Sequence, residues 1–363
     1  MKPKPRVVVA MSGGVDSSVT AYLLKQEGYE VIGMTMQLWP TAAPGEDVPG
    51  RCCSWSATAD ARRVANTLDI PYYVVNFQNV FADKVINYFC AEYLSGRTPN
   101  PCIACNRYIK FDQLLNRARA LGAEYLATGH YARIMFDPER RRYVLRRAVD
   151  LTKDQSYVLF NLTQVQLAHL LLPLGSLTKK ETRRLAEASG LPVANKPESQ
   201  EICFVTDNDY KRFIREYAPD DIKPGPFLDT AGNVLGQHEG LPFYTIGQRR
   251  GLGIAAGRPL YVVALDAARN AVILGEADEV YATELLAGDV NLILFDEWPA
   301  SLQVQAKIRY TTRPAPATIT PAGDGQVRVS FAQPQRAITP GQAVVFYLED
   351  LVVGGGTIER VFD

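Results

Sequence analysis

Apolar and amphipathic stretches alternate along the first half of the sequence. Short, largely β-branched or aromatic runs predict a buried strand at 6–9 and further strands at 29–36, 72–77 and 125–128. Between them, apolar residues recur at helical spacing and predict helices at 19–28, 56–68, 80–94 and 111–121. Because strands alternate with helices, we expect an α/β fold with a doubly wound parallel sheet.

The pattern changes after this repeat. Residues 133–149 predict a hairpin, a helix is expected from about Thr163 to before Pro173, and Thr178–Glu181 has the form of a capping box that starts a helix through Ala188. The β/α rhythm ends near Phe204, and Tyr210–Tyr217 predicts a short helix before turns rich in glycine and proline. Short strands then follow, the clearest at 303–310, 326–331 and 343–347, and about six of them predict a small closed β-barrel. We therefore expect three domains, at 1–204, 205–279 and 280–363.

Composition limits the class of protein. The formal net charge is zero over 363 residues, which argues against a uniformly basic coat but leaves room for a local basic face. No apolar run is long enough to cross a bilayer, and the first residues lack the apolar segment of a signal peptide. Six cysteines without a secretion signal suggest a reducing compartment, so we expect a cytoplasmic protein.

The stretch Ala10–Ser18 joins the first predicted strand to the first predicted helix. Gly13 and Gly14 allow a sharp turn or a close approach, and the serines offer hydroxyl groups. A helix N-terminus beside them favours a phosphate, although a plain glycine turn is the structural alternative. The Walker pattern is absent. The string Ser-Gly-Gly-Val-Asp-Ser-Ser resembles the pyrophosphate loop of the N-type ATP pyrophosphatases, which implies cleavage of ATP to AMP and pyrophosphate but leaves the acceptor open.

Cysteines mark two further stretches. Gly96–Asn106 lies between two predicted helices, is stiffened by two prolines and holds the C-x-x-C pair Cys102 and Cys105, while Cys203 follows the last α/β helix. A zinc site is not favoured, because three thiolates lack a clear fourth ligand. A redox or sulfur-transfer role fits a rigid, polar loop better than a core position does. We interpret Cys90 as a packing residue, and the adjacent Cys52 and Cys53 as packing residues or bystanders.

These stretches together resemble the tRNA-specific 2-thiouridylases, which convert the wobble uridine (position 34) of certain tRNAs to 2-thiouridine. The resemblance covers nearly the whole chain. Its motifs are 12–18, 96–106, 128–131, 153–157, 201–204 and 247–253. It implies an ATP-pyrophosphatase catalytic domain, a small central domain and a C-terminal β-barrel.

The resemblance also implies roles for individual residues. Cys203 would carry the persulfide and Cys105 would be the partner thiol. ATP would contact Ala10, Met11, Ser12, Gly13, Gly14, Val15, Asp16 and Ser17 through its phosphates, and also Met36 and Gly129. The target base would face Asn100, Pro101 and Cys102. The tRNA would contact His130, Lys153, Asp154, Gln155, Arg309, Tyr310 and Gln342. No protein-held metal site is expected.

The implied reaction needs ATP to make the uridine oxygen a leaving group, with Mg²⁺ offsetting charge on the phosphates. Asp16 is a candidate carboxylate near that ion, and a helix N-cap is its structural alternative. Sulfur on Cys203 then attacks C2, and Cys105 releases the product and leaves a disulfide with Cys203. Many members of the family have an aspartate where this chain has Cys102. A thiol therefore replaces a proposed acid–base group, or that group is dispensable.

Three alternatives remain at this point. An amide ligase that adenylates a carboxylate would share the loop, but it would give Cys105 and Cys203 no role. A tRNA-binding protein with a degenerate enzymatic domain is disfavoured by the intact loop and both cysteines. An iron–sulfur cluster on Cys102, Cys105 and Cys203 could perform the same thiolation. The sulfur donor, a cysteine desulfurase or a relay protein that carries a persulfide, and the tRNAs used are left open.

Overall fold

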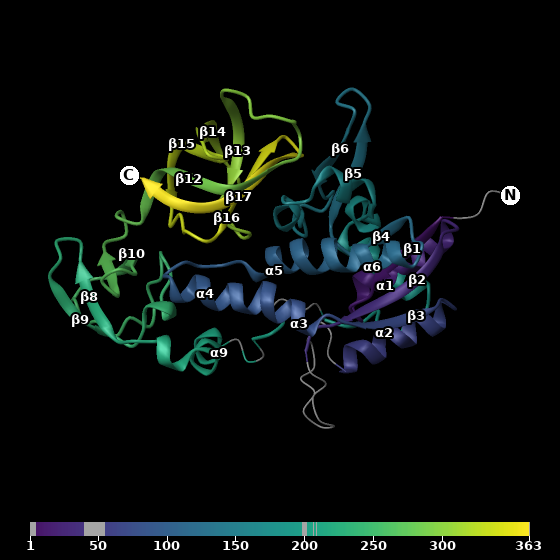
Figure 1. The fold of residues 1–363 in the computed structure, drawn as a ribbon, viewed down its shortest axis with the longest axis horizontal. Helices are drawn as coiled ribbons and strands as arrows, with labels where there is room; N and C mark the ends of the chain where they lie inside the picture. The colour runs from purple at the N-terminus through teal and green to yellow at the C-terminus, as the bar shows by residue number, and fades with distance from the viewer. Residues whose placement is uncertain (1–4, 40–54, 198–201, 206, 208, 363) are drawn as a thin grey trace. The chain divides into compact units, whose positions relative to one another are not determined.

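The computed structural model describes residues 5–39, 55–197, 202–205, 207 and 209–362 (Figure 1). Contacts divide the chain into two compact units. Unit 1 consists of Met1–Val85, Cys102–Asn208 and Asp350–Val352. Unit 2 consists of Ile86–Pro101, Asp209–Glu349 and Val353–Asp363. The predicted loop 41–50 and the pair Cys52 and Cys53 lie outside the described residues.

Unit 1 is built on a parallel sheet, as the sequence predicts. Its strands are β1 (Arg6–Ala10), β2 (Glu30–Gln37), β3 (Tyr72–Asn76), β4 (Tyr125–Ala127) and β7 (Leu170–Leu171). Their order is β3-β2-β1-β4-β7, and every neighbouring pair is parallel. The chain therefore changes direction across the sheet at β1. Ligands of such sheets bind beyond the strand ends at this switch point, which is where the glycine–serine loop lies.

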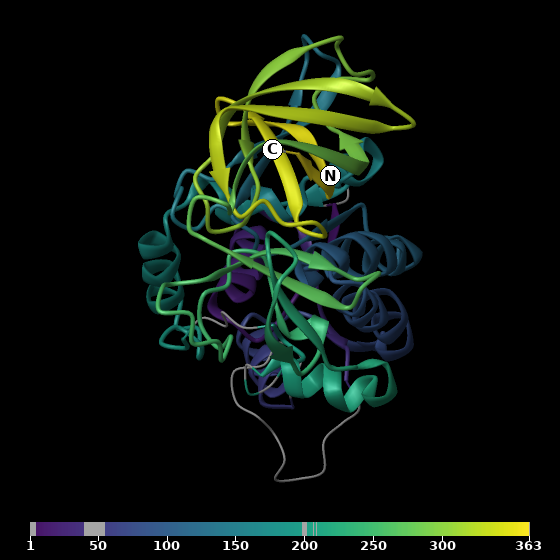
Figure 2. The same ribbon diagram turned by 90° about the vertical axis from the view of Figure 1, so that its left-hand side faces the viewer.

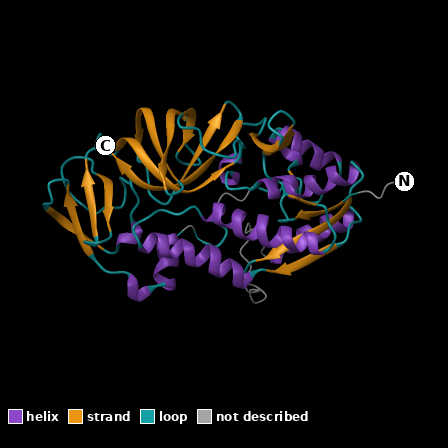
Figure 3. Cartoon of the chain, turned by 45° about the horizontal axis from the view of Figure 1, so that its top comes forward, coloured by secondary structure: helices purple, strands orange, loops and turns teal. Residues whose placement is uncertain are grey.

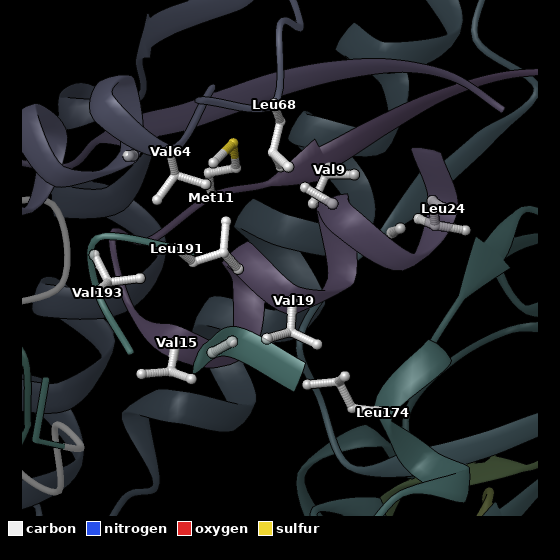
Figure 4. Packing of buried hydrophobic residues seen from close by; sticks show 14 of the residues in the cluster. Val9, Met11, Val15, Val19, Leu24, Val64, Leu68, Leu174, Leu191 and Val193 are labelled. Atoms are coloured by element: carbon white, nitrogen blue, oxygen red, sulfur yellow. The ribbon is translucent and has the colours of Figure 1, made fainter. Parts of the chain in front are cut away.

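Three helices share one apolar core with the sheet: α1 (Val15–Gln26), α2 (Trp55–Thr67) and α8 (Lys179–Ala188). Val7 and Val9 of β1 are fully buried in this core, together with Val19 of α1 and Val64 of α2. Figure 4 shows Val15 and Val19 packed near Leu191 and Leu174. The first turns of α1 therefore rest on a close-packed base, which fixes the loop before them.

The cysteine pair lies in a helix, which corrects the prediction of a loop at 96–106. A continuous helical run consists of α5 (Pro101–Ala104), the π-helical η2 (Cys105–Leu114) and α6 (Leu115–Ala120). The expected start at 111 was wrong because Pro101 opens the helix: in the first turn the missing N–H costs nothing and the fixed φ favours helix. A second run, α3 (Gln78–Phe81), η1 (Ala82–Asn87) and α4 (Tyr88–Leu94), confirms the helix predicted at 80–94.

The rest of unit 1 follows the prediction with one exception. The hairpin consists of β5 (Ala132–Asp137) and β6 (Arg142–Arg147), followed by η3 (Ser156–Leu159). The helix expected from 163 to before Pro173 is shorter: α7 (Gln164–Ala168) ends early, and β7 and η4 (Pro173–Ser176) follow. Both hydrogen bonds of the capping box join Thr178 and Glu181 at the start of α8, as the sequence predicts.

The middle of unit 2 is a small sheet with helical cover (Figure 3). Its elements are α9 (Tyr210–Tyr217), η5 (Pro219–Asp221), β8 (Gly225–Asp229), β9 (Val234–His238), η6 (Leu241–Phe243), β10 (Tyr261–Asp266) and β11 (Ala271–Gly275). The sheet order is β10-β11-β8-β9. The α4 helix belongs to this unit because the Tyr93 ring stacks on Tyr210, with centroids 5.0 Å apart, and Phe89 contacts Phe213.

A closed barrel completes the chain (Figure 2). Its strands are β12 (Tyr281–Leu292), β13 (Leu302–Lys307), β14 (Ala315–Gly323), β15 (Gln326–Arg336), β16 (Ala343–Leu348) and β17 (Leu351–Phe362). They follow the order β12-β15-β14-β13-β16-β17, and β12 pairs with β17 to close the ring. The predicted six-stranded barrel is confirmed. Within the described ranges, no helix has the length and apolar character needed to cross a membrane.

Candidate functional site

The turn between β1 and α1 has the backbone of a phosphate cradle. Gly13 has φ +69°, and a Cβ there would lie 2.1 Å from the carbonyl oxygen of Ala57, so only glycine fits. Gly14 occupies the N-cap of α1 and supplies no side-chain acceptor to the helix. The N–H groups of the first turn are therefore open to an anion, and they carry the positive end of the helix dipole. These residues fit the phosphates of ATP.

The serines of this turn hold its shape. The Ser17 hydroxyl accepts a hydrogen bond from the Ser12 N–H at 3.1 Å and donates to the Gly14 carbonyl at 3.2 Å. Ser18 donates to the same carbonyl at 2.8 Å and is fully buried. Ser12 is the partly exposed member of the three. Direct phosphate contacts from the predicted loop residues stay predictions.

Two other predicted ATP contacts lie at neighbouring strand ends. Gly129 follows β4, and a Cβ on it would come within 2.9 Å of the Asp16 carbonyl carbon and of the Ser17 nitrogen. The end of β4 therefore lies directly against the first turn of α1. Met36 lies near the end of β2 and is 7% exposed. The structure brings Gly129 to the loop, and the contact of Met36 with ATP stays a prediction.

Asp16 is engaged by a lysine from the start of α8, far along the chain. The Lys179 ammonium lies 2.7 and 2.8 Å from the two Asp16 oxygens, and the Tyr131 hydroxyl donates to the same carboxylate at 2.9 Å. Lys179 is 9% exposed. The alternative that Asp16 is the N-cap is wrong, because Gly14 occupies that position. A role of Asp16 beside Mg²⁺ stays a prediction.

A second lysine reaches the same turn. Lys196 donates to the Gly13 carbonyl at 3.1 Å and pairs with Asp60 at 2.5 Å. The site therefore gathers two ammonium groups, Lys179 and Lys196, from residues more than 160 positions beyond the loop. Each ammonium group is paired with a carboxylate, Lys179 with Asp16 and Lys196 with Asp60, so the positive end offered to a polyphosphate is that of helix α1. Local sequence carried no signal for these contacts, because only the fold joins the segments.

The two cysteines expected to react belong to unit 1, and their segments have a common neighbour. Cys105 begins η2 and is partly exposed, and η2 contacts α3. Cys203 is partly exposed and precedes Phe204, whose ring lies 6.0 Å from Phe81 of α3 and 5.9 Å from Trp39. The turn that carries Cys203 and the helical segment η2, which begins at Cys105, therefore both pack against α3.

The remaining thiols differ in exposure. Cys102 is exposed in the first turn of α5. Cys90 is buried on α4, and burial raises the pKa of its thiol to about 12, so it stays protonated and acts as a packing residue, as expected. Across the described ranges, no three metal-ligating side chains come close enough together to hold an ion. Cys102, Cys105 and Cys203 are thus not gathered into such a group among the described residues, and the iron–sulfur alternative stays a prediction.

Two predicted tRNA contacts face the protein interior. His130 is 9% exposed, and its Nδ1 lies 2.7 Å from the Thr128 hydroxyl. Burial, and secondly the nearby Lys110 ammonium, hold the pKa of His130 well below its usual value. Asp154 is 5% exposed and accepts hydrogen bonds from the Ala148 N–H and the Ser156 hydroxyl. A contact of either side chain with tRNA would need this region to open, and both contacts stay predictions.

The neighbours of Asp154 shape the same loop. Gln155 exchanges two hydrogen bonds with the Tyr131 backbone, at 2.8 Å through its N–H and at 3.0 Å through its side-chain oxygen. Lys153 is partly exposed. The Asp154–Gln155 contacts therefore present Lys153 at the surface of unit 1, and the expected contact with tRNA is retained as a prediction.

In unit 2, the barrel holds the segment that leads to the predicted base-binding residues. The Gln342 side chain donates to the carbonyls of Thr98 at 2.9 Å and Pro99 at 3.2 Å. The Thr98 N–H donates to the Pro340 carbonyl at 2.9 Å. Asn100 and Pro101 follow directly along the chain. Gln342, expected to contact tRNA, therefore fixes the backbone before these two residues.

Arg309 and Tyr310, both expected to contact tRNA, have different surroundings in the structure. The Arg309 guanidinium donates to the carbonyls of Ala337 at 2.8 Å and Ile246 at 3.1 Å, and also to the Thr339 hydroxyl. Tyr310 is 42% exposed. Arg309 thus joins barrel and central segments, while Tyr310 offers a ring on which a base could stack.

Comparison with known proteins follows the same three parts. Family models described as a tRNA methyl transferase HUP domain, a tRNA methyl transferase PRC-barrel domain and an aminomethyltransferase beta-barrel domain match residues 5–207, 211–276 and 282–358. The tRNA-specific 2-thiouridylase MnmA 1 of Thermoanaerobacter pseudethanolicus is 60% identical over 361 residues, or 99% of each chain. The tRNA-specific 2-thiouridylase MnmA of Moorella thermoacetica is 61% identical over 354 residues, covering 98% of this chain and 99% of that one.

This chain belongs to the tRNA-specific 2-thiouridylase family. A solved 4-thiouridine synthetase–RNA complex with bound ATP has 16% identity and a TM-score of 0.37, and it covers 60% of this chain and 51% of that chain. An NH3-dependent NAD synthetase from Campylobacter jejuni has 17% identity and a TM-score of 0.31, and it covers 53% of this chain and 66% of that chain. The family assignment rests on the full-length relatives alone.

As a 2-thiouridylase-family chain, the protein keeps the expected order of loop, C-x-x-C pair and later cysteine. The HUP match spans the described parts of unit 1 that carry the loop and Cys203. The domain boundaries expected at 204 and 279 stay predictions, because the contacts give two units in which Ile86–Pro101 joins the second. Cys102, in place of the aspartate of many members, is an exposed thiol at the helix start.

Proposed function

We propose that this protein is a tRNA-uridine 2-sulfurtransferase that uses ATP to convert the wobble uridine at position 34 to 2-thiouridine in the cytoplasm. The observation that carries the proposal is that one chain combines a nucleotide-binding turn with two cysteine segments that pack on the same helix. An uncapped glycine turn lies at the switch point of a parallel sheet, and the segments of Cys105 and Cys203 pack on a common helix, α3. The 60% identity to 2-thiouridylases over 99% of both chains supports this assignment.

The nucleotide half uses charge and backbone geometry. The first-turn N–H groups of α1 receive the phosphates of ATP, while Lys179 and Lys196 hold the turn through Asp16, the Gly13 carbonyl and Asp60. Mg²⁺ entering with ATP would offset further charge on the phosphates, with Asp16 the candidate carboxylate near it. ATP transfers AMP to the uridine oxygen and pyrophosphate leaves, which turns a poor leaving group into a good one.

The sulfur half uses the two cysteines. A donor protein with a persulfide first places a sulfur atom on Cys203. The terminal sulfur of that persulfide attacks C2 of the activated uridine, and AMP leaves with the C2 oxygen. The Cys105 thiolate then attacks the inner sulfur of Cys203, which breaks the S–S bond, releases 2-thiouridine and forms a Cys105–Cys203 disulfide. A cellular dithiol reductant must restore both thiols before the next turnover.

The target base must leave its stack to be reached. An anticodon loop is already single-stranded, so the cost of exposing its wobble base is small. Asn100, Pro101 and Cys102 are proposed to face that base, and Lys153 and Tyr310 to contact the surrounding tRNA. An amide ligase shares the ATP chemistry, but it leaves the paired cysteine segments without a role, so we do not favour it.

The test is a set of three matched cysteine variants: Cys203→Ser, Cys105→Ser and Cys102→Ser. With tRNA, ATP and a persulfide donor, we expect the first two to make no 2-thiouridine by nucleoside mass spectrometry. Cys105→Ser should still release pyrophosphate in a tRNA-dependent way, because adenylation does not need its thiol. Cys102→Ser should keep substantial activity and serves as the matched control.

Other outcomes would point elsewhere. Release of phosphate and ADP by the wild type would remove the pyrophosphatase assignment. Equal loss of thiolation in all three variants, together with a brown protein under anaerobic purification, would favour an iron–sulfur cluster. An inactive Cys102→Ser beside an active Cys105→Ser would show that the partner thiol is Cys102.

A further inference from the structure

The glycine-rich segment 245–253 lies in unit 2 and has no part in the proposed chemistry. Its turn is held on both sides by one side chain: Gln248 accepts from the Thr245 N–H at 3.1 Å and donates to the Arg250 carbonyl at 3.0 Å. The Gly247 N–H donates to the Val262 carbonyl at 2.8 Å, and the Val262 N–H donates to the Gln248 carbonyl at 2.9 Å. The turn is therefore a fixed part of the fold.

The turn also packs against the barrel. Gly247 has φ +85°, and a Cβ on it would lie 2.6 Å from the Ala337 Cβ and 3.7 Å from a guanidinium nitrogen of Arg336. Arg309 donates hydrogen bonds to the carbonyls of both Ile246 and Ala337 and so connects the turn to the barrel. The Arg336 guanidinium rests on the Tyr261 ring, 5.5 Å from its centroid. Arg336 therefore lies directly beside the turn, and the turn with Arg336 is called the arginine face below.

This face carries arginines without acidic partners. Arg249, Arg250 and Arg336 are all exposed, and none of them forms an ion pair in the described part of the chain. Most other exposed arginines of unit 2 are paired. The pairs are Arg212–Glu216, Arg215–Glu239, Arg258–Glu276, Arg269–Asp266 and Arg328–Glu284. In a chain of zero net charge, three guanidinium groups without ion pairs, two on this turn and one beside Gly247, are a local source of positive charge.

The position of this face gives it a specific neighbour. The Thr98 hydroxyl donates to the Thr245 hydroxyl at 3.3 Å, and Thr98 is two residues before Asn100. The arginine face and the segment leading to the predicted base-binding residues thus belong to one hydrogen-bonded network in unit 2. An arginine guanidinium group can bind a phosphate through two parallel hydrogen bonds. Phosphate contacts set the position of an RNA without reading its sequence.

We propose that Arg249, Arg250 and Arg336 form an RNA-backbone-binding surface that holds the phosphates of tRNA nucleotides next to the target base. The proposal rests on the proposed function for the identity of the RNA. It assigns the glycine-rich turn a purpose: the glycines and Gln248 present two successive guanidinium groups on a rigid support. Tyr310, which follows Arg309, supplies a stacking ring beside the same network.

The test is direct binding of unmodified tRNA, without ATP or sulfur donor, at a series of salt concentrations. The test protein is the double variant Arg249→Gln/Arg250→Gln, joined by the single variant Arg336→Gln. The matched control is Arg269→Gln/Arg360→Gln, which removes two exposed arginines elsewhere on unit 2. Thermal unfolding of each variant checks that the fold is kept.

We expect the double variant to bind tRNA more weakly by about tenfold or more near 0.1 M salt. The negative slope of log affinity against log salt should become less steep by about 1.5 to 2. Arg336→Gln should lower the slope by about 1. Turnover at saturating tRNA should change little, because these groups position the RNA and do not react. An anticodon stem-loop should show the same differences as whole tRNA, since the surface adjoins the base-binding segment.

Affinity and salt slope equal to wild type, or an equal loss in the control pair, would overturn the proposal. So would a wild-type protein that binds no tRNA. Binding is measured without catalysis, so the two proposals fail separately. A protein that makes no 2-thiouridine but binds tRNA through these arginines would remove the proposed function and keep this surface.

Discussion

The ion pair between Lys179 and Asp16 explains how an acidic residue is tolerated in the first turn of α1, where the phosphates of ATP are proposed to bind. A carboxylate there would repel the phosphates, but Lys179 lies within 2.8 Å of both its oxygens and neutralises it. The Tyr131 hydroxyl bonds the same carboxylate and Thr182, and so connects α1 to α8. The site is therefore built to receive negative charge, with the acidic side chain already compensated.

His130 predicts how stability changes with pH. Its folded pKa lies well below the unfolded value of about 6.5, chiefly because burial disfavours the charged ring. The unfolded state therefore binds more protons below pH 6.5. The stability that depends on the neutral ring is complete above that pH, and it is lost as the pH falls from 6.5 toward the lowered pKa.

We expect the free energy of unfolding, measured by urea titration, to fall between pH 7 and pH 5.5 by up to about 1.4 kcal/mol per pH unit for this proton. The variant His130→Asn should show a smaller fall over the same range. His169→Asn is the matched control, because His169 is a surface histidine bonded to the Glu124 carbonyl. Identical pH slopes for wild type and His130→Asn would contradict the prediction.

At the scale of elements, two adjacent glycines in the turn before α1 have different roles: Gly13 is needed for the fold, and Gly14 leaves space for a ligand. We expect Gly13→Ala to lower the melting temperature strongly, because its φ of +69° and the Ala57 carbonyl 2.1 Å from a Cβ leave no room. Gly14 has φ −98°, and a Cβ there meets only the Ser12 hydroxyl, at 3.5 Å. Gly14→Ala should therefore melt like wild type.

The same pair distinguishes the binding role of the turn. Gly14→Ala places a methyl group at the N-cap, where the phosphates are proposed to lie, so nucleotide affinity measured by calorimetry should drop about tenfold or more even though the fold is kept. Wild-type affinity in Gly14→Ala would count against a phosphate at this helix terminus. A wild-type melting temperature for Gly13→Ala would contradict the steric argument.

Elements with a strong local signal could be predicted from the sequence. β1, β2, α2 and α9 follow from periodicity, and the capping box fixed the start of α8 at Thr178. The helix that begins at Pro101 was missed because Gly96, Pro99 and Pro101 together suggest a loop. β7, with two residues, has no period of its own. Lys179 and Lys196 were missed because charged residues on a helix face or in a loop are usually solvated, and only the fold brings them to Asp16 and Gly13.

At the scale of the whole molecule, Gln342 offers a way to separate positioning from contact. Its side chain holds the carbonyls of Thr98 and Pro99, and small displacements of a reacting segment are costly. We expect Gln342→Met to lower the turnover of 2-thiouridine formation about tenfold or more while the dissociation constant for tRNA stays near wild type. Gln303→Met, an exposed change on β13, is the control.

The opposite result assigns Gln342 differently. Weaker tRNA binding with unchanged turnover at saturating tRNA would show that the side chain contacts the RNA, as the family resemblance implies. Sequence alone could suggest that Gln342 matters but not how. The role depends on the barrel meeting residues 97–99, which are more than 240 positions earlier in the chain.

That long-range meeting has a consequence for how the protein is made. Ile86–Pro101 leaves the ribosome about 110 residues before Asp209, the start of the segment it packs with in unit 2. Protein synthesis adds about 5–20 residues per second. Phe213 and Tyr210 are therefore made on the order of 5–20 seconds after their partners Phe89 and Tyr93. Nascent chains therefore pass through a stage in which the aromatic residues of α4 lack the partners that cover them in the complete fold. A fragment that starts at Asp209 lacks this helix. Unit 2 is therefore complete only in a chain that also contains the sequence of unit 1.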